Sequence, residues 1–307
     1  MTSNNFLITI VGPTAIGKTA LSIQLAKHFK ADIISCDSRQ FYREMRIGTA
    51  VPEADELAAS KHHFIQNRSI FDDYNVGSFE RDTLSKLDEL FRENPVQIMV
   101  GGSGLYVDAV LKGLDYFPEV DPKIRENLTE ELENKGLEYL QEKLKELDIE
   151  TYNAIEIENP KRVTRALEIC IGSGIPYSTF KNKPKAPRNF TSIKVGLNAD
   201  REIIYTRINQ RVDIMIENGL LEEAKVLYPN KNLNALQTVG YRELFSYFDE
   251  VFTKEFAISE IKKNTRRFAK RQLTWFKKDE NTLWFDYQTD INAIIAKISD
   301  KINTTNS

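Results

Sequence analysis

The sequence is poor in cysteine, nearly neutral overall and without a long hydrophobic run. Its two cysteines, Cys36 and Cys170, are too few for a disulfide scaffold or a four-ligand zinc site. A net charge of −3 gives no global sign of a polyanionic partner, so any nucleic-acid site must be a local basic region. No basic-then-apolar leader or membrane-length apolar segment occurs. We therefore expect a cytoplasmic protein that does not bind membranes.

A phosphate-binding loop is the most informative motif present. An apolar segment at 6–11 predicts a strand, and Leu21, Leu25 and Phe29 mark one face of a following helix. The residues between this strand and this helix have the complete spacing of a phosphate-binding loop. In such a loop the backbone N–H groups surround the phosphates, the lysine supplies a positive charge and the threonine supplies a magnesium ligand. A mere helix-capping turn is the less favoured interpretation. The predicted pyrophosphate-binding residues are Gly12, Pro13, Thr14, Ala15, Ile16, Gly17, Lys18 and Thr19.

Strands and helices alternate in the first part of the chain. Further apolar strands are predicted at 31–36 and 96–100, and a helix capped by Ser78 at 78–91. This alternation is typical of a parallel sheet covered on both faces by helices. The predicted fold class is α/β, with a P-loop NTPase-like parallel sheet core.

The pattern changes in the middle of the chain. Residues 121–158 contain twelve acidic and five basic residues with leucines at helical spacing, and a Pro- and Lys-rich connector covers 181–188. Strand character then resumes at 192–197, followed by one long predicted helix at 200–227. We predict an inserted, mostly helical domain at 116–189, with the core at 1–115 and 190–307.

Polar residues follow the predicted strands at the edge where ligands bind in open α/β sheets. Asp37 follows the second strand and is a candidate general base, magnesium partner or helix cap. The third strand runs into the glycine-rich segment 101–106 without the magnesium-binding aspartate expected of a nucleotide hydrolase. That absence weakens the ATPase interpretation, although ATP is the commonest ligand of such loops.

Basic residues form two further groups. Arg207 and Arg211 are four residues apart and share a helix face, where they could bind pyrophosphate or simply be solvated. Residues 261–278 contain eight Lys or Arg and no acidic residue, with aromatic residues between them. This composition favours a single-stranded nucleic acid, although some of the aromatics must be the buried face of a helix. For His62 and His63 we favour packing or substrate contacts over metal binding.

Taken together, the sequence resembles the bacterial tRNA dimethylallyltransferases, also called tRNA isopentenyltransferases. The matching motifs run in order through nearly the whole chain, and Ser103 departs from the family's usual threonine but keeps the hydroxyl. Besides the phosphate loop, they are 37–40 with Tyr42-Arg43, His62-His63, 101–106, Asp121-Pro122 with Arg125, 161–168, 211–213 with Met215, 239–242 and 270–275.

The resemblance implies transfer of a dimethylallyl group from dimethylallyl pyrophosphate to the N6 amine of the adenine immediately 3′ of the anticodon, in tRNAs reading codons that begin with U. Asp37 would take the amine proton. The departing pyrophosphate would be stabilised by Lys18, by Mg²⁺ on Thr19, and by Arg207 or Arg211. No phosphoryl group moves, which accounts for the missing aspartate.

The resemblance also implies contacts to the tRNA anticodon stem-loop, and we expect a monomer. The predicted tRNA-binding residues are Asp37, Ser38, Arg39, Gln40, Ser103, Lys161, Arg162, Val163, Thr164, Arg165, Gln237, Thr238, Val239, Gly240, Tyr241, Arg242, Lys270, Arg271, Gln272, Leu273, Thr274, Trp275, Phe276 and Lys277.

Three alternatives remain open from the residues themselves. A small-molecule P-loop kinase shares the fold and the loop but does not need the basic stretch. An adenylate allyltransferase would modify free adenine nucleotides. A non-catalytic RNA-binding protein is disfavoured by the intact Lys18, Thr19 and Asp37.

Overall fold

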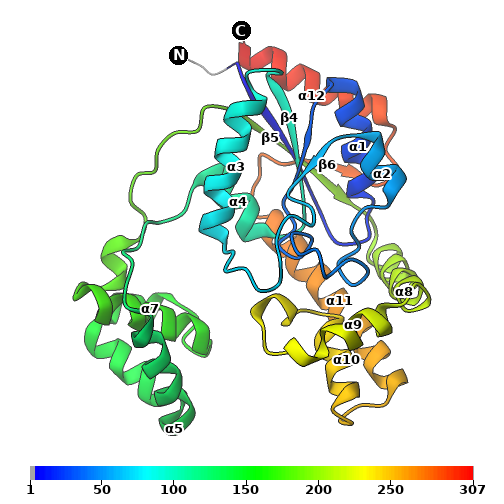
Figure 1. Cartoon of the computed structure of the whole chain (residues 1–307). Coiled ribbons are helices and arrows are strands. Elements are labelled where there is room, and N and C mark those ends of the chain that lie inside the picture. Colours follow the sequence, from blue (N-terminus) through cyan, green and yellow to red (C-terminus); the bar gives the residue numbers. More distant parts are fainter. Residues whose placement is uncertain (1–3, 307) are drawn as a thin grey trace. The chain divides into compact units, whose positions relative to one another are not determined.

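The computed structural model describes residues 4–306 and divides into two compact units (Figure 1). One unit ends at Lys112 and resumes at Arg188, and the other is the insertion Gly113–Pro187. The sequence analysis predicted the insertion at 116–189, within three residues of these bounds.

A six-stranded sheet forms the centre of the first unit, in the order β3-β2-β4-β1-β5-β6, with every pairing parallel. The predicted 31–36 strand shortens to three residues, and β6 was missed because its short, half-buried segment at the sheet edge lacks a strong apolar run. The strands are β1 (Phe6–Val11), β2 (Ile33–Ser35), β3 (His62–His63), β4 (Val96–Val100), β5 (Thr191–Asn198) and β6 (Leu283–Asp286).

Helices cover both faces of the sheet, as predicted. All six residues of β1 are buried because its side chains alternate between two apolar layers. Phe6, Ile8 and Ile10 pack in the layer with α1 and α12, whereas Leu7 and Val11 pack with α3 and α4. These helices are α1 (Lys18–Phe29), α3 (Val76–Leu90), α4 (Gly104–Lys112) and α12 (Ile291–Asn306).

Two helix predictions were wrong in detail. Helix α3 begins before Ser78, and Asn75 is its cap, because the Asn75 side chain accepts hydrogen bonds from the Gly77 and Ser78 N–H groups. The helix predicted at 200–227 breaks at Gly219, whose φ of 98° ends one helix and starts the next. The two helices are α8 (Arg201–Glu217) and α9 (Leu220–Leu227).

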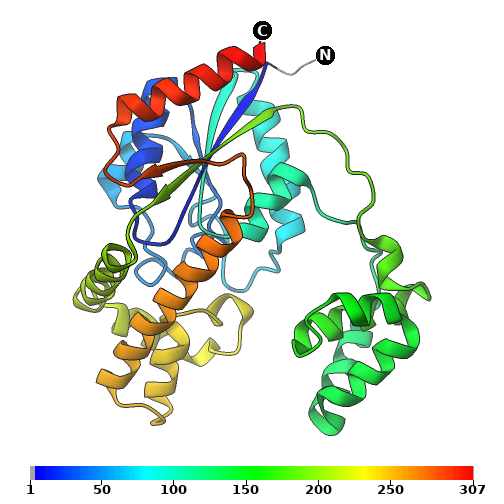
Figure 2. The same cartoon turned by 180° about the vertical axis from the view of Figure 1, so that it is seen from behind.

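A helical group lies beyond the carboxyl edge of the sheet. Helix α11 (Lys254–Phe276) contacts α4, α8 and α10 (Tyr241–Phe248), and Figure 2 shows it from behind as it runs from the sheet to α10. The unit also contains α2 (Ala54–Ala59) and 3₁₀ turns at Tyr228–Asn230 and Asn234–Leu236.

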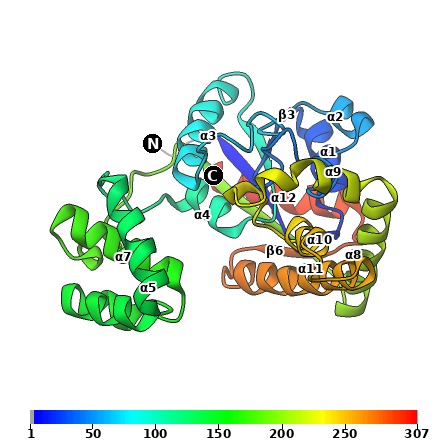
Figure 3. The same ribbon diagram turned by 60° about the horizontal axis from the view of Figure 1, so that its bottom comes forward.

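The insertion is helical and has its own core. Helices α5 (Pro122–Leu147) and α7 (Pro160–Ser173) lie side by side (Figure 3), with α6 (Ile149–Ala154) and a 3₁₀ turn at Tyr177–Phe180 beside them. Gly136, at φ 83°, interrupts α5. In residues 4–306, no helix combines the length and apolar character that a membrane crossing requires.

Candidate active site

The phosphate loop connects β1 to α1 at the carboxyl edge of the sheet. Gly12 has φ 145°, and a Cβ there would lie 2.5 Å from the Leu197 carbonyl oxygen, so only glycine lets the loop pass β5. The Lys18 side chain turns back over this loop. Its Nζ donates to the carbonyl oxygens of Gly12 at 3.1 Å and Pro13 at 2.8 Å. These two hydrogen bonds therefore hold the Lys18 ammonium group over the loop at the N-terminus of α1, where an anion would bind.

Arg207 and Arg211 of α8 both contact this loop, in agreement with the prediction that they share a helix face. Arg207 Nε donates to the Ala15 carbonyl oxygen at 2.7 Å, and an Arg211 Nη1 lies 3.3 Å from Thr14 Oγ1. Burial, with the neighbouring Arg211 charge, lowers the pKa of Lys18 to about 8 despite an opposing effect of Asp37. Burial also lowers the pKa of Arg211. Crowded, half-buried cations of this kind make a site suited to a multiply charged anion.

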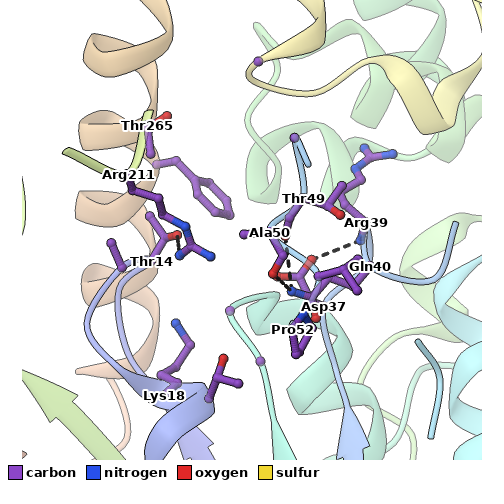
Figure 4. Close-up of a pocket in the computed structure, with 18 of the residues that line it drawn as sticks. Thr14, Lys18, Asp37, Arg39, Gln40, Thr49, Ala50, Pro52, Arg211 and Thr265 are labelled. Carbon is purple, nitrogen blue, oxygen red and sulfur yellow. Dashed lines mark hydrogen bonds between the residues drawn. The ribbon is translucent and has the colours of Figure 1, made fainter. Parts of the chain in front are cut away.

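Asp37 lies across the cavity from these cations. Figure 4 shows Lys18, Thr14 and Arg211 on one side and Asp37 on the other. The Arg39 backbone N–H donates to Asp37 Oδ1 at 3.0 Å, which fixes the carboxylate in a turn after β2. Ser103 Oγ accepts a hydrogen bond from the Ser38 N–H at 3.1 Å. This contact joins the loop after β2 to the loop after β4.

A loop at residues 46–52 completes the wall on the Asp37 side. Gln40 Nε2 donates to the carbonyl oxygens of Thr49 at 3.2 Å and Ala50 at 2.9 Å (Figure 4). Sequence reasoning missed this loop because it contains no motif and no charge run. Gln40 was predicted to touch RNA, but its amide is engaged here, so in this structure it supports the wall.

Helix α11 contributes a further side chain to the site. Gln272 Oε1 accepts from the Thr14 N–H at 2.9 Å, and Gln272 Nε2 donates to the Gly102 carbonyl oxygen at 2.9 Å. Its side chain is buried with both ends paired, so the predicted direct RNA contact is replaced by a supporting role. Trp275, by contrast, is 39% exposed, and its Nε1 donates to Asp108 at 3.0 Å.

These elements enclose a cavity of about 950 Å³. The structure brings the phosphate loop, Arg207, Arg211 and part of the predicted RNA-binding set together around this cavity. The predicted residues that line the cavity are Thr14, Ala15, Ile16, Gly17, Lys18, Thr19, Asp37, Ser38, Arg39, Gln40, Ser103, Arg207, Arg211, Thr238, Val239, Gly240, Arg271, Gln272 and Trp275.

Other predicted RNA contacts lie elsewhere. Val163, Tyr241 and Phe276 are at most 2% exposed in hydrophobic cores, so the prediction that they touch RNA is wrong, and they serve packing. Each lies on the buried face of a helix whose other face carries the charges. Leu273 also packs partly against a core layer. The predicted residues outside the cavity that remain exposed are Lys161, Arg162, Gln237, Arg242, Lys270, Thr274 and Lys277.

The basic stretch on α11 is only partly free for a polyanion. Lys262 pairs with Asp213 and Lys263 with Glu260. Arg267, Lys270 and Arg271 are exposed. The exposed cations of this stretch therefore lie from Arg267 onward, toward the C-terminal end of the helix.

The insertion carries basic residues of its own. Arg125 and Arg165 both bind one oxygen of the buried Glu168, at 2.7 and 2.9 Å. The shared carboxylate holds the two guanidinium groups together at a half-exposed position. Lys161 and Arg162 are exposed, and Thr164 is half-buried.

The described residues around the cavity include a hydroxyl group that could bind a metal ion, but they form no cluster of acidic side chains. Within residues 4–306, no group of three or more His, Cys, Asp or Glu side chains could hold an ion. Thr19 lines the cavity in the first turn of α1, and its side chain carries a hydroxyl group. His62, whose Nδ1 lies 2.7 Å from the Ser60 carbonyl oxygen, also lines it, whereas His63 pairs with Asp32 at 2.8 Å.

The parallel sheet, the strand–loop–helix phosphate loop and the cations around it define an α/β protein of the phosphate-loop class. A family model described as IPP transferase matches residues 40–279 of this chain. The chain belongs to this family, which confirms the resemblance found in the sequence.

Similar proteins agree along the whole chain. A protein of Flavobacterium psychrophilum named tRNA dimethylallyltransferase is 64% identical, covering 97% of this chain and 99% of its own. A protein of the same name from Christiangramia forsetii is 60% identical, covering 98% of this chain and 100% of its own. The tRNA isopentenylpyrophosphate transferase structure of Bacillus halodurans is similar at TM-score 0.74 and 36% identity, covering 98% of each chain. A eukaryotic dimethylallyltransferase acting on tRNA gives TM-score 0.77 at 26% identity, covering 94% of this chain and 75% of its own.

Proposed function

We propose that this protein transfers a dimethylallyl group from dimethylallyl pyrophosphate to the N6 amine of the adenine immediately 3′ of the anticodon, in tRNAs reading codons that begin with U. The observation that carries the proposal is one cavity with half-buried cations on one wall and the Asp37 carboxylate on the other. Relatives named tRNA dimethylallyltransferase support the substrate class. We further propose that the protein acts as a monomer in the cytoplasm, where tRNA is found.

The cationic wall suits a leaving pyrophosphate. Lys18, Arg207 and Arg211 converge on the phosphate loop, and burial disfavours the charge of two of them until an anion arrives. A bound pyrophosphate would give these cations an anionic partner in place of the neutral oxygens that they now contact. They stabilise the negative charge that develops as the allylic carbon–oxygen bond breaks.

The transfer is an alkylation. The N6 lone pair forms a bond to C1 of the dimethylallyl group while the bond from C1 to the pyrophosphate oxygen breaks, and pyrophosphate leaves with that electron pair. The amine then carries one proton too many. Asp37 Oδ1 is oriented by the Arg39 N–H, and the other carboxylate oxygen has no hydrogen-bond donor in residues 4–306. That oxygen is available to take the proton.

A magnesium ion fits the site only together with the ligand. The Thr19 hydroxyl supplies one oxygen, and Mg²⁺ is commonly bound by one or two protein groups, phosphate oxygens and water. When bound, the ion would add positive charge at the pyrophosphate. Thr19 is the residue that would hold it.

The adenine must leave the stacked anticodon loop to reach Asp37. Trp275 and Phe268 line the cavity and are 39% and 37% exposed, so they offer aromatic faces to neighbouring bases. Lys270 and Arg271 are exposed on the same helix for contacts to phosphates. The RNA side and the pyrophosphate side thus meet along α11.

Labelled dimethylallyl pyrophosphate tests the proposal when it is incubated with the protein and either unmodified tRNA or AMP. Label is expected in tRNA alone, and digestion should place it on the adenosine next to the anticodon. Label in AMP alone would favour a free-nucleotide transferase. Consumption of ATP without any transfer of label would favour a kinase.

A further inference from the structure

Glu223, on the first turn of α9, is bonded at both carboxylate oxygens. Oε2 accepts hydrogen bonds from the backbone N–H groups of Arg46 at 2.9 Å and Ile47 at 2.8 Å. Oε1 accepts from the Gly48 N–H at 2.9 Å and from the Tyr241 hydroxyl at 2.6 Å. A carboxylate has about four acceptor positions, so this group is fully used.

The Tyr241 ring reinforces the same contact. A Cβ on Gly48 would lie 2.6 Å from the ring, so the aromatic face rests directly on the Gly48 backbone. Tyr241 is fully buried. This burial is the main cause that raises the pKa of its hydroxyl far above the usual value, and the nearby negative charge of Glu223 raises it further. The hydroxyl therefore stays protonated and remains a donor. Carboxylate and ring together hold three consecutive residues of the loop.

The loop transmits this support to the reactive side of the cavity. Immediately after Gly48, the carbonyl oxygens of Thr49 and Ala50 accept both hydrogen bonds from Gln40 Nε2. The Gln40 backbone N–H donates to the Asp37 carbonyl oxygen at 3.1 Å. A continuous set of hydrogen bonds thus links α9 to the segment that carries Asp37. In Figure 4, Thr49 and Ala50 lie beside Gln40 and Asp37, across from Lys18.

We propose that Glu223 is a positioning residue, which holds loop 46–50 in place and, through Gln40, orients Asp37 toward the acceptor adenine. The inference rests on the proposed function for its catalytic consequence. Glu223 does not contact the phosphate loop, so its influence belongs to the acceptor side. Its removal should leave pyrophosphate binding intact.

Three variants and one control separate this role from general stability. Glu223→Ala removes all four hydrogen bonds. Glu223→Gln keeps the shape but has a single acceptor oxygen and an NH₂ group that cannot accept. Tyr241→Phe removes one bond and keeps the ring on Gly48. Glu222→Ala is the control, because Glu222 is an exposed carboxylate in the same helical turn.

Two measurements are made on each variant. Hydrogen exchange should accelerate by about tenfold or more at residues 46–50 and also at 37–40 in Glu223→Ala, as expected for lost local protection. kcat/KM for tRNA should fall by about tenfold or more while KM for dimethylallyl pyrophosphate stays within about twofold. Glu223→Gln should follow the same direction, Tyr241→Phe should show a smaller change, and Glu222→Ala should match the wild type.

The outcomes are distinct. Unchanged exchange at 37–40, or an equal loss for both substrates, would overturn the proposal. If the wild type transfers no label to tRNA, the proposed function fails. The role of Glu223 in supporting the Asp37 side of the cavity is then still decided by two measurements, hydrogen exchange at residues 37–40 and calorimetric binding of inorganic pyrophosphate. If Glu223→Ala does not fold, Glu223→Gln and Tyr241→Phe carry the same comparison.

Discussion

The side-chain oxygen of Gln272 lies 2.9 Å from the backbone nitrogen of Thr14 and accepts its hydrogen bond. Through the same side chain, α11 also binds the Gly102 carbonyl oxygen. One residue therefore connects the helix that carries Lys270 and Arg271 to the phosphate loop and to the loop after β4. In the proposed reaction, this contact joins the tRNA side of the enzyme to the pyrophosphate side.

Replacing Gln272 with Leu should weaken both folding and pyrophosphate binding. The substitution leaves the Thr14 N–H and the Gly102 carbonyl without their partner, and each unpaired buried group costs about 1–3 kcal/mol. Thermal unfolding and calorimetry with inorganic pyrophosphate measure the two effects. Thr274→Val, two residues along on the exposed face of α11, is the control. Unchanged stability and affinity would show that the bridge contributes nothing.

Pyrophosphate affinity should depend on the protonation of Lys18. Burial lowers the pKa of Lys18 to about 8 in the free protein, and a bound anion favours the charged ammonium and so raises that pKa. Affinity should therefore be fully present below pH 8 and fall as the pH rises above it. Calorimetry at several pH values measures the fall. The Lys18→Arg variant keeps its positive charge over the whole pH range, so its affinity should not fall in this way. Identical pH profiles for the two proteins would show that Lys18 is not the group that titrates.

Asp37→Asn should lower kcat by about 10²–10⁴-fold, the usual contribution of a general base. The amide keeps the shape of the carboxylate but cannot take the amine proton. Affinity for tRNA, measured by filter binding, should stay within about twofold because no charge contact to phosphate is lost. Asp73→Asn removes an exposed carboxylate outside the cavity and should behave as wild type. A near-normal kcat for Asp37→Asn would remove Asp37 as the base.

Replacing Lys270 and Arg271 together with Ala should weaken tRNA binding and flatten its salt dependence. Each lost phosphate contact reduces the slope of log affinity against log salt by about 0.7–0.9. Binding titrations at several salt concentrations measure the slope. Lys297→Ala, an exposed lysine on α12, should leave it unchanged. A double variant with the wild-type slope would mean that these two residues do not face the RNA.

Local patterns predicted much of this site. The phosphate loop is contiguous, so eight neighbouring residues define it, and Asp37 follows directly from its place at the end of a buried strand. Helical spacing placed Arg207 and Arg211 on one face, and both reach the loop. The family motifs together identified the chain, and the comparisons confirm the family.

Long-range partners could not be predicted in the same way. Glu223 binds backbone groups about 175 residues away, and backbone N–H groups leave no trace in the sequence. Tyr241 and Phe276 belong to polar motifs, but helical geometry turns them into the core while their charged neighbours face outward. Which residue of a motif supports the fold and which meets the ligand depends on packing between distant segments.

We propose that the phosphate loop holds a leaving pyrophosphate. Dimethylallyl pyrophosphate with radioactive carbon in the allyl group and radioactive phosphorus in the pyrophosphate, incubated with unmodified tRNA, tests this role of the loop. We expect the carbon label to enter tRNA and the phosphorus label to be released as intact pyrophosphate in an equal amount. Phosphorus label on the tRNA, or phosphate release without carbon transfer, would show that the loop serves another reaction.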